Sequence, residues 1–557
     1  MKLKKLLNKI DYKLIKGNDD VEISDIAYDS RNVSDGYAFI CIVGNNVDGH
    51  DYIDSAIANG AKVIIVSKEV EVDSEVSVVL IEDTSKYLSR LSMNLFDNPH
   101  KKMTTIAITG TKGKTTTSFM IKSILEESGK KCGVIGTTGI YIGNKYYPNN
   151  NTTPLSYDTI KYMDEMIKDG IEYLVMEVSS QALKYDRVND IVFDYGVFTN
   201  LTQDHISEFE HSDMDDYVHS KAKLFKQCVN GVFNLDDEYF FNMVDMGESS
   251  INTYGYDDKA DLRVKCIDLY RDGHLIGIDL ELDGVIKDKF KISTPGKFSS
   301  YNAMAAIYVC YLMGIDVKYM KKALSDFSVR GRVEPVEVSD KFTLLIDYAH
   351  NGVSTESILT TIREYNPKRI VTIFGCGGNR SRDRRYEMGE IAGKYSDYCI
   401  ITEDNNRYEE FDDIAKDILV GISKTSCEYK IIPDRIETGT LLCMAAALAA
   451  IVVLSVLRDT VKNEAIFTSK IDAKLLGCIA HEKKRMSLKD RIKKKKKGLL
   501  IGSNSYISLN FTESFNKIAA KIPNCAPAPN KNIDGFERSG PKSIIAPIPI
   551  NKRIGIA

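Results

Sequence analysis

The sequence lacks the cysteine and histidine patterns that mark metal or disulfide scaffolds. Its 11 cysteines form no C-x-x-C pair and no grid with the 8 histidines. This absence predicts reduced, mostly buried thiols in a cytoplasmic protein. No apolar run follows the basic start of the chain, so we expect no secretory signal. Neither sign of charge dominates, with 74 Lys and Arg against 78 Asp and Glu, so we expect no nucleic-acid partner.

The chain is long enough for several cores. At about 100–200 residues per domain, 557 residues predict three or four domains. Hydrophobic content of 43% and charged content of 27% exclude a mostly disordered or collagen-like chain. The charge is uneven, because residues 1–435 carry a net charge of −16 and residues 436–557 carry +12. An acidic, well-patterned region is therefore followed by a basic tail of different character.

Short apolar runs alternate with helical patterns through the acidic region, which predicts α/β domains with largely parallel sheets. We place the domains at 1–98, 99–327 and 328–435, with the tail at 436–557. The expected strands are 27–31, 37–43, 61–66, 103–109, 132–135, 173–178, 195–199, 231–234, 343–347, 370–374 and 398–402. The expected helices include 86–96, 115–127, 354–364 and 385–394.

A glycine-rich loop lies between the expected strand 103–109 and the expected helix 115–127. Its residues are Gly110, Thr111, Lys112, Gly113, Lys114, Thr115 and Thr116. Such a loop directs backbone N–H groups at phosphate oxygens, and the helix N-terminus adds positive potential. We expect Lys114 to reach the β- and γ-phosphates and the Thr115 hydroxyl to ligate Mg²⁺. The loop predicts nucleotide binding, although only two residues separate its glycines.

This short loop, G-T-x-G-K-T-T, resembles that of the Mur ligases, the ATP-dependent amide-forming enzymes of peptidoglycan precursor synthesis. Further motifs match in order over about residues 20–435, and they are most similar to those of the tripeptide-forming members. These are D-S-R at 29–31, G-N-N-V-D-G-H at 44–50, N-T-T-P at 151–154, M-E-V-S-S-Q-A-L at 176–183, T-N-L-T-Q-D-H at 199–205, D-Y-A-H at 347–350 and G-C-G-G-N-R at 375–380. The resemblance implies three domains: a small N-terminal UDP-sugar domain, a central ATP-binding domain and a Rossmann-like third domain that is incomplete here.

The resemblance implies ATP-dependent ligation with ATP and Mg²⁺ as cofactors. ATP would phosphorylate the D-glutamate γ-carboxylate of UDP-N-acetylmuramoyl-L-alanyl-D-glutamate, and the amine of a diamino acid would attack the acyl phosphate. Beside Lys114 and Thr115, the implied catalytic and metal-ligating residues are Glu177, His205 and a carbamylated Lys221. Hard oxygen ligands suit Mg²⁺, and carbamylation turns a cation into an anion. Further implied ATP contacts are Asn302, Arg332 and Asp347.

The resemblance also assigns residues to the two other substrates. Those implied for the UDP-sugar are Ser30, Asn151, Thr152, Thr153, Ser179, Tyr185 and Arg187. Those implied for the diamino acid are Arg385, Asp404, Asn405, Asn406 and Arg407. In the family, D-N-P-R accompanies meso-diaminopimelate, because the arginine pairs with the distal carboxylate. Arg407 is kept here, which favours meso-diaminopimelate, and Asn406 replaces that proline, which leaves L-lysine or another diamino acid open.

The family pattern stops after Arg435, where a helix and a G-K-G-H-E motif are expected and do not follow. Residues 431–447 instead resemble UDP-N-acetylglucosamine enolpyruvyl transferase, which suggests a fusion or an assembly error. A remnant that binds nucleotide and ligates poorly is therefore an alternative. Another ligase, such as folylpolyglutamate synthetase, is disfavoured by N-T-T-P and D-N-x-R. We expect a monomer. The uncharged stretch 440–457 favours a buried helix, so we expect no membrane association. The proline-rich C-terminal end is expected to be disordered.

Overall fold

The computed structural model describes residues 1–433 except 45–46, 205, 208–209, 273–274 and 337–341. The chain divides into two compact units. The first contains residues 1–270 and 277–329, and the second contains residues 271–276 and those from 330 onward. The expected tail, with the stretch 440–457 and nearly all of the transferase-like stretch, lies outside the described residues.

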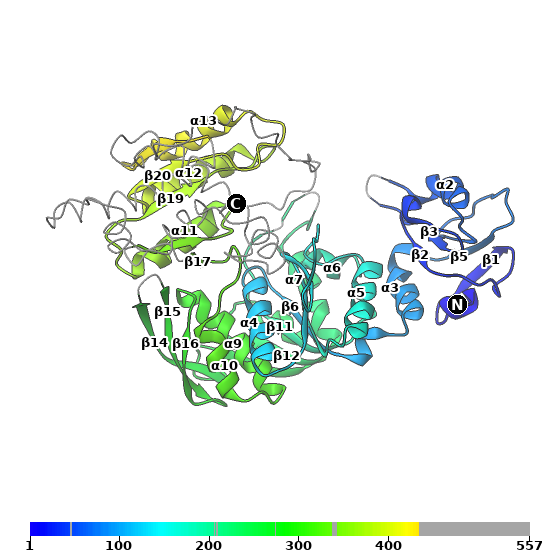
Figure 1. The fold of residues 1–557 in the computed structure, drawn as a ribbon, viewed down its shortest axis with the longest axis horizontal. Helices are drawn as coiled ribbons and strands as arrows, with labels where there is room; N and C mark the ends of the chain where they lie inside the picture. The colour runs from blue at the N-terminus through cyan, green and yellow to red at the C-terminus, as the bar shows by residue number, and fades with distance from the viewer. Residues whose placement is uncertain (45–46, 205, 208–209, 273–274, 337–341, 434–557) are drawn as a thin grey trace, which may run out of the picture. The chain divides into compact units, whose positions relative to one another are not determined.

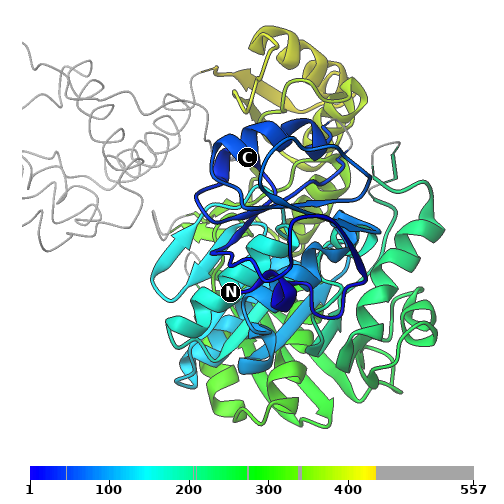
Figure 2. The same ribbon diagram turned by 90° about the vertical axis from the view of Figure 1, so that its right-hand side faces the viewer.

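The N-terminal part of the first unit is a small sheet of order β1-β5-β4-β3-β2, blue in Figures 1 and 2. Only β1 runs antiparallel to its neighbour. The strands are β1 (Tyr12–Lys16), β2 (Ile26–Ala27), β3 (Ala38–Ile40), β4 (Val63–Val66) and β5 (Ser77–Ile81), and the helices are α1 (Leu3–Leu6), α2 (Ile53–Ala58) and α3 (Thr84–Leu95). All four residues of β4 are buried, as expected for a parallel strand with both faces covered.

One expected strand of this sheet is shorter than the sequence predicts. The expectation of a strand over 27–31 is wrong beyond Ala27, where β2 ends, and Ser30–Asn32 form a 3₁₀ helix. The carboxylate of Asp29 accepts a hydrogen bond from the backbone N–H of Arg31 at 3.0 Å. This local turn competes with strand pairing, as aspartate side chains commonly do.

The central part of the first unit is an eleven-stranded sheet of order β16-β15-β14-β13-β12-β11-β6-β10-β7-β8-β9. Its strands are β6 (Thr104–Thr109), β7 (Cys132–Gly136), β8 (Gly139–Ile142), β9 (Lys145–Tyr147), β10 (Tyr173–Glu177), β11 (Phe193–Phe198), β12 (Cys228–Asn234), β13 (Ser250–Gly255), β14 (Leu262–Asp272), β15 (Leu275–Gly284) and β16 (Asp288–Ile292). The pairs from β7 through β10, β6, β11 and β12 to β13 are parallel. The carboxyl ends of these strands therefore lie along one edge, where α/β sheets bind ligands.

Helices cover both faces of the central sheet (Figure 1). They are α4 (Lys114–Glu127), α5 (Ser156–Lys168), α6 (Ser180–Lys184), α7 (Met214–Ala222), α8 (Phe240–Asp245), α9 (Lys297–Leu312) and α10 (Val317–Ser325). Side chains alternate along β6, so Ile106 and Ile108 pack with α4, α9 and α10, whereas Ala107 packs with α5 to α8. Nearly every residue of β6 is buried, which explains its continuous apolar run.

The second unit carries its own small sheets. Its elements are β17 (Glu334–Val336), β18 (Leu344–Ile346), α11 (Gly352–Glu364), β19 (Val371–Phe374), α12 (Arg382–Tyr395), β20 (Tyr398–Ile401), α13 (Phe411–Ile422) and β21 (Glu428–Ile431). Strands β19, β20 and β21 are parallel neighbours, and β17 pairs with β18 in antiparallel fashion. Helices α12 and α13 contribute Met388 and Ile418 to the buried core beneath β20.

Candidate active site

The glycine-rich loop follows β6 and ends at the first residue of α4. Gly110 and Gly113 adopt φ values of +149° and +86°, which L side chains rarely adopt. A Cβ atom on Gly110 would lie 2.0 Å from Thr199 Oγ1, and one on Gly113 would lie 2.3 Å from Asn302 Oδ1. Only glycine fits at these two positions, so the loop brings its backbone close to its neighbours.

A neighbouring strand end braces the same loop. The backbone N–H of Lys112 donates to Asn200 Oδ1 at 2.9 Å, and Asn200 Nδ2 donates to the Lys112 carbonyl at 3.0 Å. The Thr199 hydroxyl also donates to the Lys112 carbonyl at 2.8 Å. Both residues follow β11, which pairs with β6, so the parallel register holds the two loops together.

Two lysine ammonium groups converge on this loop. Lys114 Nζ donates to the Gly110 carbonyl at 2.7 Å, and Lys221 Nζ donates to the same oxygen at 2.9 Å. Lys221 is 1% exposed and lies 4.6 Å from the centroid of the Tyr217 ring. Burial, and secondarily the charge of Lys114, hold the pKa of Lys221 well below its usual value. The Lys114 ammonium and the N-terminus of α4 fit an anion such as a nucleotide phosphate.

A buried carboxylate stands beside the loop. Glu177, the last residue of β10, is fully buried. Its carboxylate accepts hydrogen bonds from the Thr115 hydroxyl at 3.0 Å and from the Thr137 N–H and hydroxyl at 3.0 and 3.1 Å. A Cβ atom on Gly136 would lie 2.2 Å from Glu177 Oε1. A carboxylate paired with the loop threonine is a donor set of hard oxygens that fits Mg²⁺.

The predicted substrate residues of the N-T-T-P and M-E-V-S-S motifs gather at the same strand end. The Thr153 hydroxyl donates to the Glu177 carbonyl at 2.9 Å and accepts from the Ser179 N–H at 3.0 Å. Arg187 Nη1 donates to the Thr153 carbonyl at 3.1 Å. Thr152 Oγ1 lies 3.1 Å from Thr137 Oγ1. These residues are predicted to bind one substrate, and the structure brings them together.

The remaining predicted substrate residues differ in burial. Asn151 and Tyr185 are exposed, whereas Ser30 is buried in the N-terminal sheet region. Asn302, on α9, is buried and accepts a hydrogen bond from the Thr117 hydroxyl at 3.4 Å. His205 lies outside the described residues.

The second unit contains the remaining predicted nucleotide residues. Asp347 accepts hydrogen bonds from the N–H groups of Val333 and Ala349 at 2.9 and 2.8 Å. The guanidinium of Arg332 lies 4.7 Å from the centroid of the Tyr348 ring. Arg332 and Asp347 therefore belong to one small cluster of this unit.

The predicted diamino-acid residues follow β20 in the second unit. Asp404, Asn405, Asn406 and Arg407 form one loop between β20 and α13. Arg385 lies on α12, with its side chain 1% exposed and its terminal nitrogens paired with Glu409 and Asp417. Neither carboxylate partner belongs to the motifs from which the site residues were predicted.

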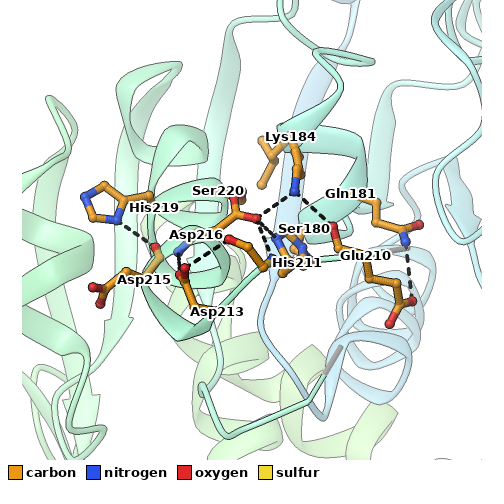
Figure 3. Close-up of polar contacts among 12 residues, drawn as sticks. Ser180, Gln181, Lys184, Glu210, His211, Asp213, Asp215, Asp216, His219 and Ser220 are labelled. Carbon is orange, nitrogen blue, oxygen red and sulfur yellow. Dashed lines mark hydrogen bonds and ion pairs between the residues drawn. The ribbon is translucent and has the colours of Figure 1, made fainter. Parts of the chain in front are cut away.

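His211 is a buried residue that the sequence analysis missed (Figure 3). Its Nδ1 lies 3.2 Å from Asp216 Oδ2, and its Nε2 lies 2.9 Å from Ser180 Oγ. Asp216 also accepts a bond from Lys184 Nζ at 2.6 Å. The network ties α6, which follows the Glu177 strand, to α7, which carries Lys221. Burial lowers the pKa of His211, so the ring is neutral at pH 7.

Known proteins resemble this chain in both domain order and sequence. Three family models match in order: "Mur ligase family, catalytic domain" over residues 22–95, "Mur ligase middle domain" over 108–310 and "Mur ligase, glutamate ligase domain" over 331–456. A UDP-N-acetylmuramoyl-L-alanyl-D-glutamate--2,6-diaminopimelate ligase of Caldanaerobacter subterraneus subsp. tengcongensis is 40% identical over 438 residues, 78% of this chain and 90% of that protein. The chain belongs to the Mur ligase family.

Further relatives agree with this Mur ligase assignment. The Clostridium perfringens protein of the same name is 41% identical over 426 residues, 75% of this chain and 87% of that protein. A solved structure titled as that ligase superposes with a TM-score of 0.60 at 24% identity, over 79% of this chain and 90% of that one, which shows the shared fold. The expected family, architecture and ligase class are confirmed.

Two observations concern the C-terminal end and membranes. The third family match reaches residue 456, past the seam expected at Arg435. Among the described residues, no helix combines the length and apolar character needed to cross a membrane.

We predict that Lys114→Ala lowers ATP-dependent phosphate release by at least about 100-fold, because the transferred phosphoryl group loses a counter-charge. The fold should be retained, since the side chain is only half-buried. Malachite-green phosphate assays and circular dichroism test this. The control is Lys122→Ala on the same helix, whose ammonium pairs with Glu126. Near-normal turnover of Lys114→Ala with an unchanged spectrum contradicts the assignment.

We predict that His211 contributes to loss of stability in acid. Because its folded pKa is depressed, the unfolded chain binds the extra proton first as pH falls below about 6.5, and stability drops by about 1.4 kcal/mol per unit of depression. Melting temperatures measured from pH 7.5 to 5 should therefore fall more steeply for the wild type than for His211→Asn. The exposed neighbour His219 serves as control, and His219→Asn should follow the wild-type slope (Figure 3). Equal slopes for all three proteins refute the prediction.

Proposed function

We propose that this chain joins meso-2,6-diaminopimelate to the D-glutamate of UDP-N-acetylmuramoyl-L-alanyl-D-glutamate with hydrolysis of ATP. The observation that carries the proposal is the meeting of the phosphate loop with the Thr152–Thr153 segment at Glu177. It brings a phosphate-binding backbone beside residues suited to an acidic peptide. The names of the relatives at about 40% identity support the same reaction.

The loop residues would hold the nucleotide. Backbone N–H groups at the start of α4 would bind the phosphates, and the Lys114 ammonium would stabilise the negative charge that develops on the γ-phosphoryl group. Thr115, Glu177 and Lys221, the last as its carbamate, would hold Mg²⁺, with His205 as a further expected ligand. The ion, when bound, neutralises phosphate charge and orients the transferred group. Asn302, Arg332 and Asp347 are the further proposed nucleotide contacts.

The acceptor carboxylate would bind beside this site. The planar guanidinium of Arg187 suits the carboxylate of D-glutamate. Both Arg187 and the backbone N–H of Ser179 donate hydrogen bonds to Thr153. Transfer of the γ-phosphoryl group to the carboxylate gives an acyl phosphate and ADP. The diamino-acid amine then attacks the acyl carbon, phosphate leaves, and the amine loses a proton. The protein supplies no nucleophile, because ATP provides the activation.

The choice of diamino acid depends on Arg407. Its side chain is exposed in the loop after β20, where it is able to pair with a second carboxylate. meso-Diaminopimelate has that distal carboxylate, and L-lysine lacks it. Asn406 replaces the proline that precedes this arginine in the family motif D-N-P-R. L-Lysine is therefore the alternative substrate, and it should be measured directly.

We predict that Lys221 carries a carbamate. Addition of CO₂ to the neutral amine, with release of one proton, would convert this buried side chain into an anion close to the glycine-rich loop 110–116. Protein equilibrated with ¹³C-bicarbonate should show a carbamate resonance in ¹³C NMR spectra. The resonance should vanish in Lys221→Arg and persist in Lys223→Arg, which changes an exposed lysine two residues on. A spectrum without the resonance in the wild type contradicts the prediction.

The decisive test is ligation by the full chain. The assay contains UDP-N-acetylmuramoyl-L-alanyl-D-glutamate, ATP, Mg²⁺ and either meso-diaminopimelate or L-lysine. We expect tripeptide and an equal amount of phosphate with meso-diaminopimelate only. Tripeptide with lysine instead changes the substrate assignment. Calorimetric ATP binding without tripeptide from either amino acid supports the fusion-remnant alternative.

A further inference from the structure

Two loops of the second unit pack against each other at the carboxyl ends of β19 and β20. A Cβ atom on Gly375 would lie 2.3 Å from the Thr402 carbonyl oxygen, and one on Gly378 would lie 1.9 Å from that of Asn406. The Gly378 N–H donates to the Asn405 carbonyl at 2.8 Å. The loop 375–380 therefore supports the loop 402–410 through a backbone contact for which only glycine leaves room.

Arg407 sits at the exposed tip of a tight turn in that second loop. The Glu409 N–H donates to the Asn406 carbonyl at 2.9 Å, which closes the turn around Arg407 and Tyr408. Arg407 has φ +52°, a left-handed conformation that costs free energy for a residue with a Cβ. Such a backbone persists only where its surroundings over-determine it.

Glu409 supplies much of that restraint. Its carboxylate accepts from Arg385 Nη1 and Nη2, both at 2.8 Å, in a two-pronged ion pair. It also accepts from the backbone N–H of Asn379, whose side-chain oxygen accepts from the Tyr408 N–H at 3.2 Å. Glu409 and Asn379 thus bind the turn on the C-terminal side of Arg407 to the loop 375–380.

Arg385 is the buried base of this assembly. Nη1 also donates to Asp417 Oδ2 at 2.9 Å, and Nη2 donates to the Gly377 carbonyl at 3.4 Å. Both terminal nitrogens are therefore engaged within the described residues. The ion pair lowers the pKa of Glu409 to about 2, so its carboxylate is ionised at neutral pH. An Arg–carboxylate fork fixes the relative orientation of its two partners as well as their distance.

We propose that the Arg385–Glu409 ion pair is a positioning device that holds the Arg407 turn in its left-handed conformation and thereby sets selectivity for a diamino acid with a distal carboxylate. The inference rests on the proposed function and adds Glu409 as a residue that determines specificity without touching the substrate. Release of the turn would leave Arg407 charged and present, with its guanidinium spread over many orientations.

The principal variant is Glu409→Gln, which keeps the shape of the side chain and removes its charge. We expect the KM for meso-diaminopimelate to rise about tenfold, with kcat and the KM for ATP within about twofold of the wild type. The rate ratio of meso-diaminopimelate over L-lysine should fall, because only the former uses Arg407. The matched control is Glu410→Gln, an exposed neighbour at the start of α13, which should leave all these values unchanged.

A double-mutant cycle tests whether the Arg385–Glu409 ion pair acts as a unit. If it does, Arg385→Lys and Glu409→Gln each raise the KM for meso-diaminopimelate, and the double variant raises it by clearly less than the product of the two factors. Factors that multiply show that the two side chains act independently, and that result overturns the proposal. Should Arg385→Lys not fold, Glu409→Gln and its control still decide the question through the KM split.

Limited trypsin digestion gives a readout that does not depend on ligation. Trypsin cleaves after arginine, and the bond between Arg407 and Tyr408 lies in the turn. We expect cleavage there to be about tenfold faster in Glu409→Gln than in the wild type or in Glu410→Gln, as mapped by mass spectrometry. Unchanged cleavage overturns the positioning role. A different combination is a wild-type chain that ligates neither amino acid and a Glu409→Gln variant that is still cleaved faster than the wild type. That combination would support the positioning role of the ion pair and reject the proposed function.

Discussion

The ammonium groups of Lys114 and Lys221 share the carbonyl oxygen of Gly110, and much of the first unit is arranged around that meeting. Burial and the charge of Lys114 both lower the pKa of Lys221, and the Asp204 carboxylate opposes them. Lys114 is fixed because α4 begins at the loop, and Lys221 is fixed because α7 packs against α6 and α8. The residue at position 110 must be glycine, since it has no room for a side chain. A carbamate on Lys221 would turn this buried amine into an anion.

The parallel sheet explains why residues distant in sequence reach this point. Strands β6, β7, β10 and β11 run in the same direction, so the residues that follow them lie along one edge. That edge receives the phosphate loop, Thr137, the Glu177–Ser179 segment and Thr199. Buried Glu177 is tolerated there because threonine hydroxyls and a backbone N–H satisfy its oxygens. The same hydrogen bonds fix the carboxylate beside the Thr115 hydroxyl, its partner in the proposed Mg²⁺ site.

The second unit uses a related device for a different purpose. Its glycines allow two loops to touch, and a buried ion pair between Arg385 and Glu409 fixes the outer one. The polar network of His211, Ser180 and Asp216 plays a comparable part in the first unit, where it joins α6 to α7. In both places a hydrogen-bond network of polar or charged side chains joins two separate segments, and one of those segments carries an expected site residue: Lys221 on α7, or Arg407 in the loop after β20.

The sequence by itself determined the family, the three-domain order and most strands of the parallel sheets, because fully buried strands are continuous apolar runs and the phosphate loop has a local glycine pattern. It also singled out Lys114, Thr115 and Glu177 as expected site residues, through motifs that lie within a few residues of a strand end. Only the tertiary structure revealed the roles of His211 and Glu409, whose partners Ser180 and Arg385 are 31 and 24 residues away in sequence. A lone histidine or glutamate in a helix or loop has no local signature, since its burial and its partner depend on how separate elements pack. The strand expected to continue through Asp29 failed for the converse reason, because a local aspartate turn outweighed the apolar pattern.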